Sequence, residues 1–131
     1  MIYKIQERTF LLYTNQKESL NNMKNPKDYN CPVDATISKI GGKYKDVILF
    51  HLKHDTLRYN EIRKKIPSIT DKMLAQQLRE LESDNLIIRK VYPVVPPKTE
   101  YSLSDLGQTL IPILDAMCDW GAQFMQDNSE K

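Results

Sequence analysis

The chain of 131 residues is poor in the residue types on which several classes of functional site depend. It contains two cysteines and two histidines, which is too few for a disulfide framework. The spacing of Cys31, His51, His54 and Cys118 matches no compact zinc-ligand motif. Gly41-Gly42 reads as a helix stop rather than a phosphate-binding loop, and no nucleophile stands with a base and an orienting group. We therefore expect neither an enzyme nor a bound metal or cofactor.

Long apolar runs are also missing, because none approaches the ~20 residues that a membrane-spanning helix needs. Hydrophobic residues make up 40% of the chain and charged residues 27%, which is typical of one soluble domain with its own core. Lys4, Glu7 and Arg8 precede the longest apolar run of the N-terminus, 10–13, so this segment does not resemble a secretory signal. We expect a cytoplasmic protein without a membrane partner.

Charge is unevenly distributed, although the formal net charge is only +2. Residues 1–50 carry a net charge of +3, residues 51–98 carry +4, and residues 99–131 carry -5. A protein with a basic face toward phosphates and an acidic face away from them has this polarity. The alternative is a solvated surface of uneven charge, and charge alone does not decide between the two.

Residues 1–30 are expected to be an N-terminal extension or arm, because their turn-forming asparagines indicate weak structure. Two interpretations stay open. Met23 is a possible start of the native protein, with residues 1–22 an upstream extension. Alternatively, a genuine arm packs on a partner subunit through its apolar residues, which are Ile2, Ile5, Phe10 and Leu12.

Residues 31–104 have the pattern of a winged helix-turn-helix. A helix from Tyr59 to Lys65 is stopped by Pro67, and Thr70 is a good N-cap for a second helix that runs to about residue 84. Strands at 87–94 and 101–103, joined by a stiff tip at Pro96-Pro97-Lys98, would form the wing. The expected fold is mainly α with a small β-hairpin wing, an α+β arrangement.

Two helices are expected before this motif. Pro32 suits the first helical position of a helix with Cys31 as its cap, and Gly41-Gly42 would end that helix. Another helix is expected at 43–53, followed by a short extended piece at 57–59.

The second helix of the motif has two distinct faces. Leu74, Leu78 and Leu81 share one face, and the opposite face carries long polar side chains of the kind that contact bases and phosphates in a major groove. Arg79 has an alternative role in a salt bridge with Glu82. The expected DNA-binding residues of the whole motif are Arg58, Lys64, Lys65, Ser68, Thr70, Lys72, Met73, Gln76, Gln77, Arg79, Lys90 and Lys98.

Residues 105–131 are expected to form one long C-terminal helix, capped by Ser104. This helix has more apolar surface than a small domain can cover, which suggests a dimer. The expected interface residues are Leu110, Leu114, Met117, Trp120 and Phe124, and Cys118 is expected to pack beside Leu114.

The chain resembles the HxlR-type winged-helix transcriptional regulators, which are relatives of the MarR group. Tyr44 departs from the pattern, because the family usually has tryptophan after Gly-Gly-Lys. Residues 1–22 have no counterpart in it. The stretches that carry the resemblance are Cys31-Pro32-Val33, Ile40-Gly41-Gly42-Lys43, Arg58-Tyr59-Asn60-Glu61-Ile62, Lys72-Met73-Leu74, Leu78-Arg79-Glu80-Leu81-Glu82, residues 91–97, Glu100-Tyr101-Ser102-Leu103, Leu106-Gly107 and Trp120-Gly121.

The resemblance implies a prokaryotic regulator that dimerises through N- and C-terminal helices and reads a near-palindromic operator. Several family members respond to oxidants or electrophiles through a cysteine near the N-terminus, and Cys31 is at that position. First-turn amides, Lys24 and Lys27 would favour a reactive thiolate there. The alternative from the residues alone is a small buried side chain at a helix start. A winged-helix module that binds protein rather than DNA is the competing function.

Overall fold

The computed structural model describes residues 28–129, so the predicted arm, Met23, Lys24 and Lys27 lie outside the described residues. The chain divides into two compact units between Ser38 and Lys39. Helix α2 (Pro32–Ile40) begins and ends where the sequence predicts. The carbonyl of Cys31 accepts a hydrogen bond from the N–H of Ala35 at 3.1 Å, as expected of the residue that caps α2, and the Cys31 side chain is exposed.

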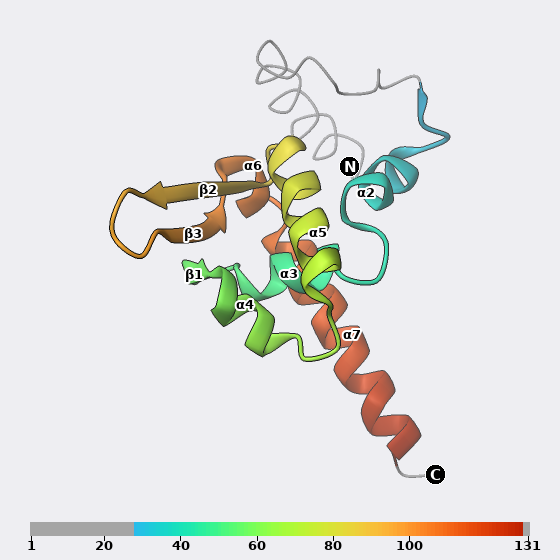
Figure 1. Ribbon diagram of the computed structural model, residues 1–131. Helices are drawn as coiled ribbons and strands as arrows, with labels where there is room; N and C mark the ends of the chain where they lie inside the picture. Colours follow the sequence, from blue (N-terminus) through green and yellow to red (C-terminus); the bar gives the residue numbers. More distant parts are fainter. Residues whose placement is uncertain (1–27, 130–131) are drawn as a thin grey trace. The chain divides into compact units, whose positions relative to one another are not determined.

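The second unit contains the winged helix-turn-helix (Figure 1). Its three strands form an antiparallel sheet of order β1-β3-β2, and β2 pairs with β3 from Ile87↔Leu103 to Tyr92↔Lys98. This arrangement confirms the mainly α fold with a hairpin wing, to which β1 adds a third, short strand. The elements are α3 (Lys45–His51), β1 (Leu57–Arg58), α4 (Tyr59–Lys65), α5 (Asp71–Ser83), β2 (Ile87–Tyr92), β3 (Lys98–Leu103), α6 (Asp105–Gln108) and α7 (Ile111–Ser129).

The core of this unit is built from aliphatic side chains that recur on one face of each helix. The predicted face of α5 is buried, with Leu74 and Leu81 at 0% exposure and Leu78 at 2%. Ile62 and Ile66 point inward from α4 and its C-terminus, as predicted, and α3 contributes Ile48 and Leu49. Burying aliphatic side chains in this way is the main favourable term in folding. The polar face of α5 is therefore left toward solvent.

Two hydroxyl caps hold the helix starts that the sequence predicts. The Oγ1 of Thr70 accepts a hydrogen bond from the N–H of Met73 at 3.1 Å, and the Oγ of Ser104 accepts one from the N–H of Gly107 at 2.9 Å. The Ser104 hydroxyl also donates to the carbonyl of Asn85 at 2.5 Å. Ser104 thus links the start of α6 to the turn before the wing.

The predicted single C-terminal helix was wrong, because the structure has α6 and α7 in its place. The N–H groups of Thr109 and Leu110 bond three residues back, to Leu106 and Gly107, which tightens the chain into a turn. Pro112 has no N–H to bond the fourth residue before it, so α7 begins anew around this proline.

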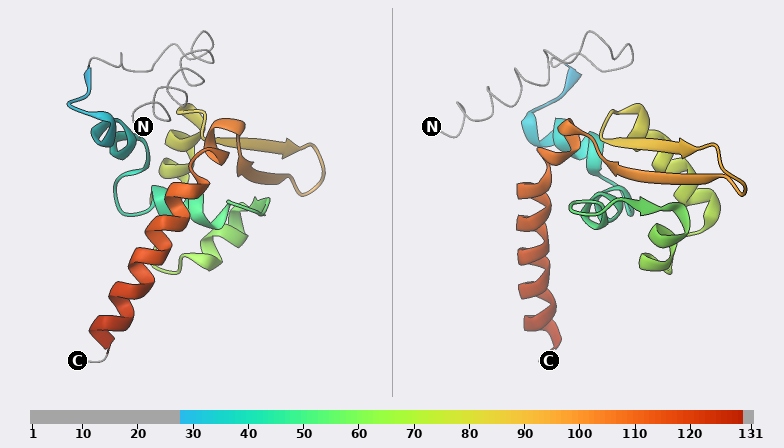
Figure 2. Two further views of the ribbon diagram at one scale, coloured as in Figure 1. Left: turned by 180° about the vertical axis from the view of Figure 1, so that it is seen from behind. Right: turned by 90° about the vertical axis from the view of Figure 1, so that its left-hand side faces the viewer.

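Helix α7 extends beyond the rest of its unit (Figures 1 and 2). Leu114, assigned from the sequence to a dimer surface, is instead 2% exposed in the core of its own chain, and Leu110 packs against that core. Cys118 was expected to pack beside Leu114, but it is exposed. Beyond residue 115 every described residue of α7 except Gly121 is exposed, because this part of the helix leaves the core.

Candidate nucleic-acid interface

The face of α5 opposite its leucines is open to solvent. Lys72, Gln76, Arg79 and Ser83 are all exposed, and Met73 is 37% exposed at the edge of the face. Gln77 lies nearer the core, where its amide donates a hydrogen bond to Glu80 at 3.0 Å. The views in Figures 1 and 2 place α5 and α7 on opposite sides of the unit. The face therefore offers cations and an amide without obstruction from α7.

Polar contacts hold the turn between α4 and α5. The guanidinium Nε of Arg63 lies 2.8 Å from a carboxylate oxygen of Asp71, and the hydroxyl of Tyr59 donates to the Asp71 carbonyl at 3.1 Å. Desolvation by burial, together with the Asp71 carboxylate, raises the pKa of Tyr59. These contacts join α4 directly to the first turn of α5.

Tyr44, which stands where the family usually has tryptophan, reaches the same turn. Its hydroxyl donates to the carbonyl of Ser68 at 3.3 Å and lies 3.5 Å from the Ser68 hydroxyl, and the hydrogen bond with that hydroxyl lowers the pKa of Tyr44. The aromatic ring also packs against the core. Ser68 and Thr70 themselves are exposed on the turn.

The basic side chains of residues 39–129 fall into two groups. One group is neutralised within the chain by carboxylates, through the pairs Lys39–Asp84, Lys45–Glu80, Lys53–Asp115, Arg63–Asp71 and Arg89–Glu82. The other group forms no ion pair within the described part of the chain, and it includes the predicted DNA contacts Arg58, Lys64, Lys65, Lys72, Arg79 and Lys90. Positive charge is therefore left available where the sequence predicts phosphate contacts.

Lys98 is an exception among the predicted contacts. It belongs to β3 rather than to the wing tip, and its ammonium lies 3.0 Å from Glu100. The hydroxyl of Tyr92 also donates to Glu100 at 3.0 Å. The hydrogen bond from Lys98 is the main cause of the lowered pKa of Glu100. Lys98 is thus less free for a phosphate than Lys90, whose ammonium lies 4.9 Å from the centre of the Tyr92 ring.

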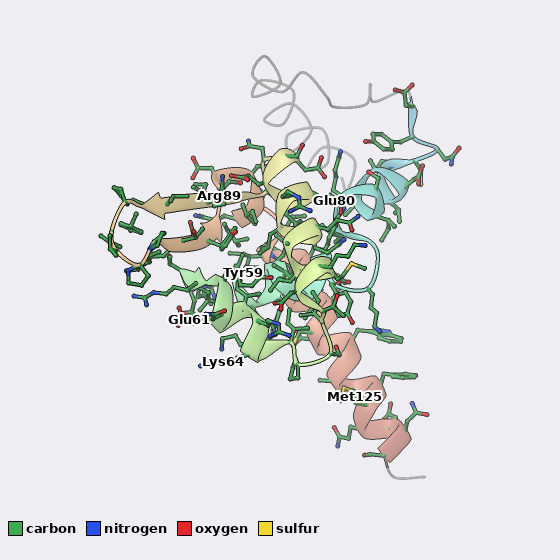
Figure 3. All side chains as sticks on the ribbon, viewed as in Figure 1. Tyr59, Glu61, Lys64, Glu80, Arg89 and Met125 are labelled. Atoms are coloured by element: carbon green, nitrogen blue, oxygen red, sulfur yellow. The ribbon has the colours of Figure 1, made fainter. Side chains whose placement is uncertain are left out.

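Arg89 is a candidate that the sequence analysis missed. It helps to line a groove of about 300 Å³ between α4, α5 and the wing. Arg89 lies on β2 (Figure 3). Its Nε lies 3.5 Å from Glu82, so Glu82 faces Arg89, and the alternative Arg79–Glu82 salt bridge is not formed. The alternation of side chains along a strand could have indicated this role, because it places Arg89 on the opposite face of β2 from Lys90. The groove is lined by Tyr59, Ala75, Leu78, Arg79, Glu82, Arg89 and Tyr101.

The profile of the HxlR-like helix-turn-helix family matches residues 39–129. The chain belongs to this family. The HxlR-like match covers the helix-turn-helix, the wing and α7, and it begins after Cys31. In the described residues no group of three His, Cys, Asp or Glu side chains is placed to hold a metal ion, and no helix is long and apolar enough to cross a membrane.

Named relatives agree with the HxlR-like assignment. The chain is 56% identical over 99 residues to the uncharacterised HTH-type transcriptional regulator YtcD of Bacillus subtilis, covering 76% of this chain and 79% of YtcD. It is 50% identical over 104 residues to an uncharacterised HTH-type transcriptional regulator of Methanothermobacter thermautotrophicus, covering 78% and 79% of the two chains. The solved structure of the redox regulator HypR in its oxidised form aligns with a TM-score of 0.69 at 49% identity, covering 71% of this chain and 96% of HypR.

Proposed function

We propose that this protein is a sequence-specific DNA-binding transcriptional regulator that binds a near-palindromic operator as a homodimer in the cytoplasm. The observation that carries the proposal is the exposed face of α5, on which Gln76 stands with two cations, Lys72 and Arg79, that have no ion-pair partner among residues 28–129. The names of the relatives, which are HTH-type transcriptional regulators, support it.

The side chains divide into base readers and phosphate contacts. Gln76 is suited to pair with adenine and Arg79 with guanine, because an amide and a guanidinium each make two hydrogen bonds to those bases in the major groove. Phosphates would be bound at the ends of the motif by exposed cations and hydroxyls. The proposed phosphate contacts are Arg58, Lys64, Lys65, Ser68, Thr70, Lys72 and Lys90. Arg89, on wing strand β2, would join them by exchanging its Glu82 partner for a phosphate.

The dimer would form through the part of α7 that leaves the core. Met117, Trp120 and Phe124 are 42%, 70% and 53% exposed and follow one helical face with Ile113. Trp120 and Phe124 stack with ring centres 5.3 Å apart. A second copy of this helix would cover the apolar face, and the two recognition helices would then read half-sites about 34 Å apart.

A response to oxidants or electrophiles is proposed through Cys31. Its side chain is exposed at the start of α2, and the solved relative HypR is described as a redox regulator. Modification of the thiol would add bulk or charge at this helix start. Such a change can shift a dimer between binding and non-binding states.

A protein-interaction module without DNA binding is the competing function. The test is a gel shift with the DNA upstream of the protein's own gene, in the presence of scrambled duplex as competitor. We expect specific retention that weakens steeply with salt, because bound phosphates release counterions. Equal affinity for both DNAs would reject specific recognition and favour the interaction module.

A further inference from the structure

The tip of the wing carries no charge, although basic residues stand on both sides of it. Residues 91–97 read Val-Tyr-Pro-Val-Val-Pro-Pro, with Arg89-Lys90 before them and Lys98 after them. Val95 is 100% exposed, more than any other large hydrophobic side chain of the described residues, and Val91 and Val94 are about half exposed. A side chain in full contact with water contributes nothing to its own core. Its apolar character is available for a partner.

The tip is stiff and poor in hydrogen-bond donors. Pro93, Pro96 and Pro97 have no N–H, and the N–H of Val94 donates to the carbonyl of Tyr92 at 2.9 Å. Between residues 93 and 97 this leaves one backbone donor, the N–H of Val95. Prolines and β-branched valines have few conformations, so little conformational freedom is lost when such a tip is ordered against a partner.

The dimensions of the wing suit the groove next to the one that α5 would occupy. Strands β2 and β3 have six residues each, and at a rise of about 3.3 Å per residue each spans roughly 20 Å. The nearest minor groove lies about half of a 34 Å helical turn from the centre of the contacted major groove. The hairpin extends away from the core beside α4 and α5 (Figures 1 and 2). Lys90 would then stand at the phosphates that border the minor groove.

Resting on the proposed DNA-binding function, we propose that the wing tip enters this minor groove with Val95 foremost and selects A·T or T·A over G·C pairs by excluding the guanine 2-amino group. In the minor groove A·T and T·A pairs present only acceptors, whereas G·C adds this amino donor. A valine side chain cannot accept its hydrogen bond. Burying the amino group against Val95 would therefore leave a donor unsatisfied, which costs binding free energy.

The test uses duplexes carrying the site that the protein selects from random DNA, varied only at the base pairs beneath the wing. Three versions have A·T, G·C or inosine·cytosine there, since inosine lacks the 2-amino group. We expect inosine·cytosine to bind like A·T and G·C to bind about five- to tenfold more weakly, within the usual cost of one mismatched pair. In Val95→Ser the hydroxyl can accept from the amino group, so this difference should fall below about twofold.

Two variants of the same hairpin serve as controls. Ile88→Ala removes an apolar side chain that is 51% exposed at the base of the wing, and it should keep the full discrimination. Lys90→Ala should weaken binding to all three duplexes and lower the salt dependence without changing their ratio. Equal binding of inosine·cytosine and G·C, or full discrimination by Val95→Ser, would overturn the inference while specific binding persists. Absence of any selected site would instead reject the DNA-binding function itself.

Discussion

Gly107 lies so close to Leu86 that a Cβ built on the glycine would be 2.1 Å from the Leu86 carbonyl oxygen. The same carbonyl accepts a hydrogen bond from the N–H of Ser104 at 3.1 Å. The residue before β2 therefore contacts both the residue after β3 and helix α6. This contact sets the base from which the wing extends.

Gly107→Ala should destabilise the fold by about 1–3 kcal/mol, because a methyl group has no room against backbone. Gly121→Ala is the matched control, since nothing lies within 4 Å of a Cβ there. Because alanine favours the helix over glycine, this change should raise the free energy of unfolding by as much as about 1 kcal/mol. Urea unfolding at one fixed protein concentration measures both changes. Equal stability of Gly107→Ala and wild type would mean that the approach to Leu86 relaxes freely.

Gln76→Ala and Arg79→Ala should each weaken operator binding by about 1–3 kcal/mol and relax sequence preference, as loss of a paired base contact does. Lys72→Ala should weaken binding to all sequences and lower the salt slope by about one. Lys53→Ala is the control, because Lys53 is paired with Asp115 away from α5, and it should leave the slope unchanged. Unaltered affinity and preference in Gln76→Ala would mean that the reading face is misassigned.

Trp120→Ser with Phe124→Ser should convert the proposed dimer to monomer without unfolding the chain. These side chains are exposed in the single chain, so the substitutions remove interface but no core, whereas deletion of residues 105–131 would also remove the buried Leu114. Sedimentation velocity and circular dichroism report the two properties separately. Gln126→Ser, on the opposite face of α7, should stay dimeric. A persistent dimer in the double variant would move the interface elsewhere.

The free energy of unfolding should decrease as the pH is lowered below neutrality, because of His51. Desolvation by burial, with a smaller effect of Lys65, lowers the pKa of His51 from its ordinary 6.5. The unfolded chain therefore binds a proton more readily, and the native state loses stability as pH falls through 6.5 toward the lower folded value. His51→Gln should flatten thermal stability between pH 7 and about 5.5, above the range where most carboxylates titrate. His54→Gln should retain the wild-type slope, and an identical slope in all three proteins would contradict the assignment.

Treatment with diamide or a quinone should change operator affinity in wild type and in Cys118→Ser, but not in Cys31→Ser. Both thiols are exposed, so Cys118→Ser controls for general thiol modification. Because Cys118 is exposed rather than packed as the sequence had predicted, reagents can reach it as readily as Cys31, which makes it a suitable control. If Cys31→Ser responds like wild type, Cys31 has no role beyond starting α2.

Much of the fold follows from local chemistry that one sequence displays. Pro67 and the hydroxyl of Thr70 act within a few residues of themselves, so they mark the end of α4 and the start of α5 without knowledge of the rest. The leucine spacing of α5 likewise identifies both its buried face and the polar face opposite, because helical periodicity alone relates the two.

Features that depend on distant neighbours could not be predicted in this way. Leu114 and Trp120 look alike in the sequence as apolar residues of one helix, yet the first is 2% exposed and the second 70%. The difference arises because α7 passes the core near its start and then leaves it. The pairing of Lys98 with Glu100 likewise needs the strand register.

The sequence by itself determined where α2, α4 and α5 form, which face of α5 is polar, and the family to which the chain belongs, because caps, prolines and periodicity are local properties. Only the tertiary structure decided which cations remain unpaired, that Arg89 joins Arg79 in one groove, and how much of α7 is left uncovered. Ion pairing and burial depend on residues far apart in the chain, and folding alone brings those residues together.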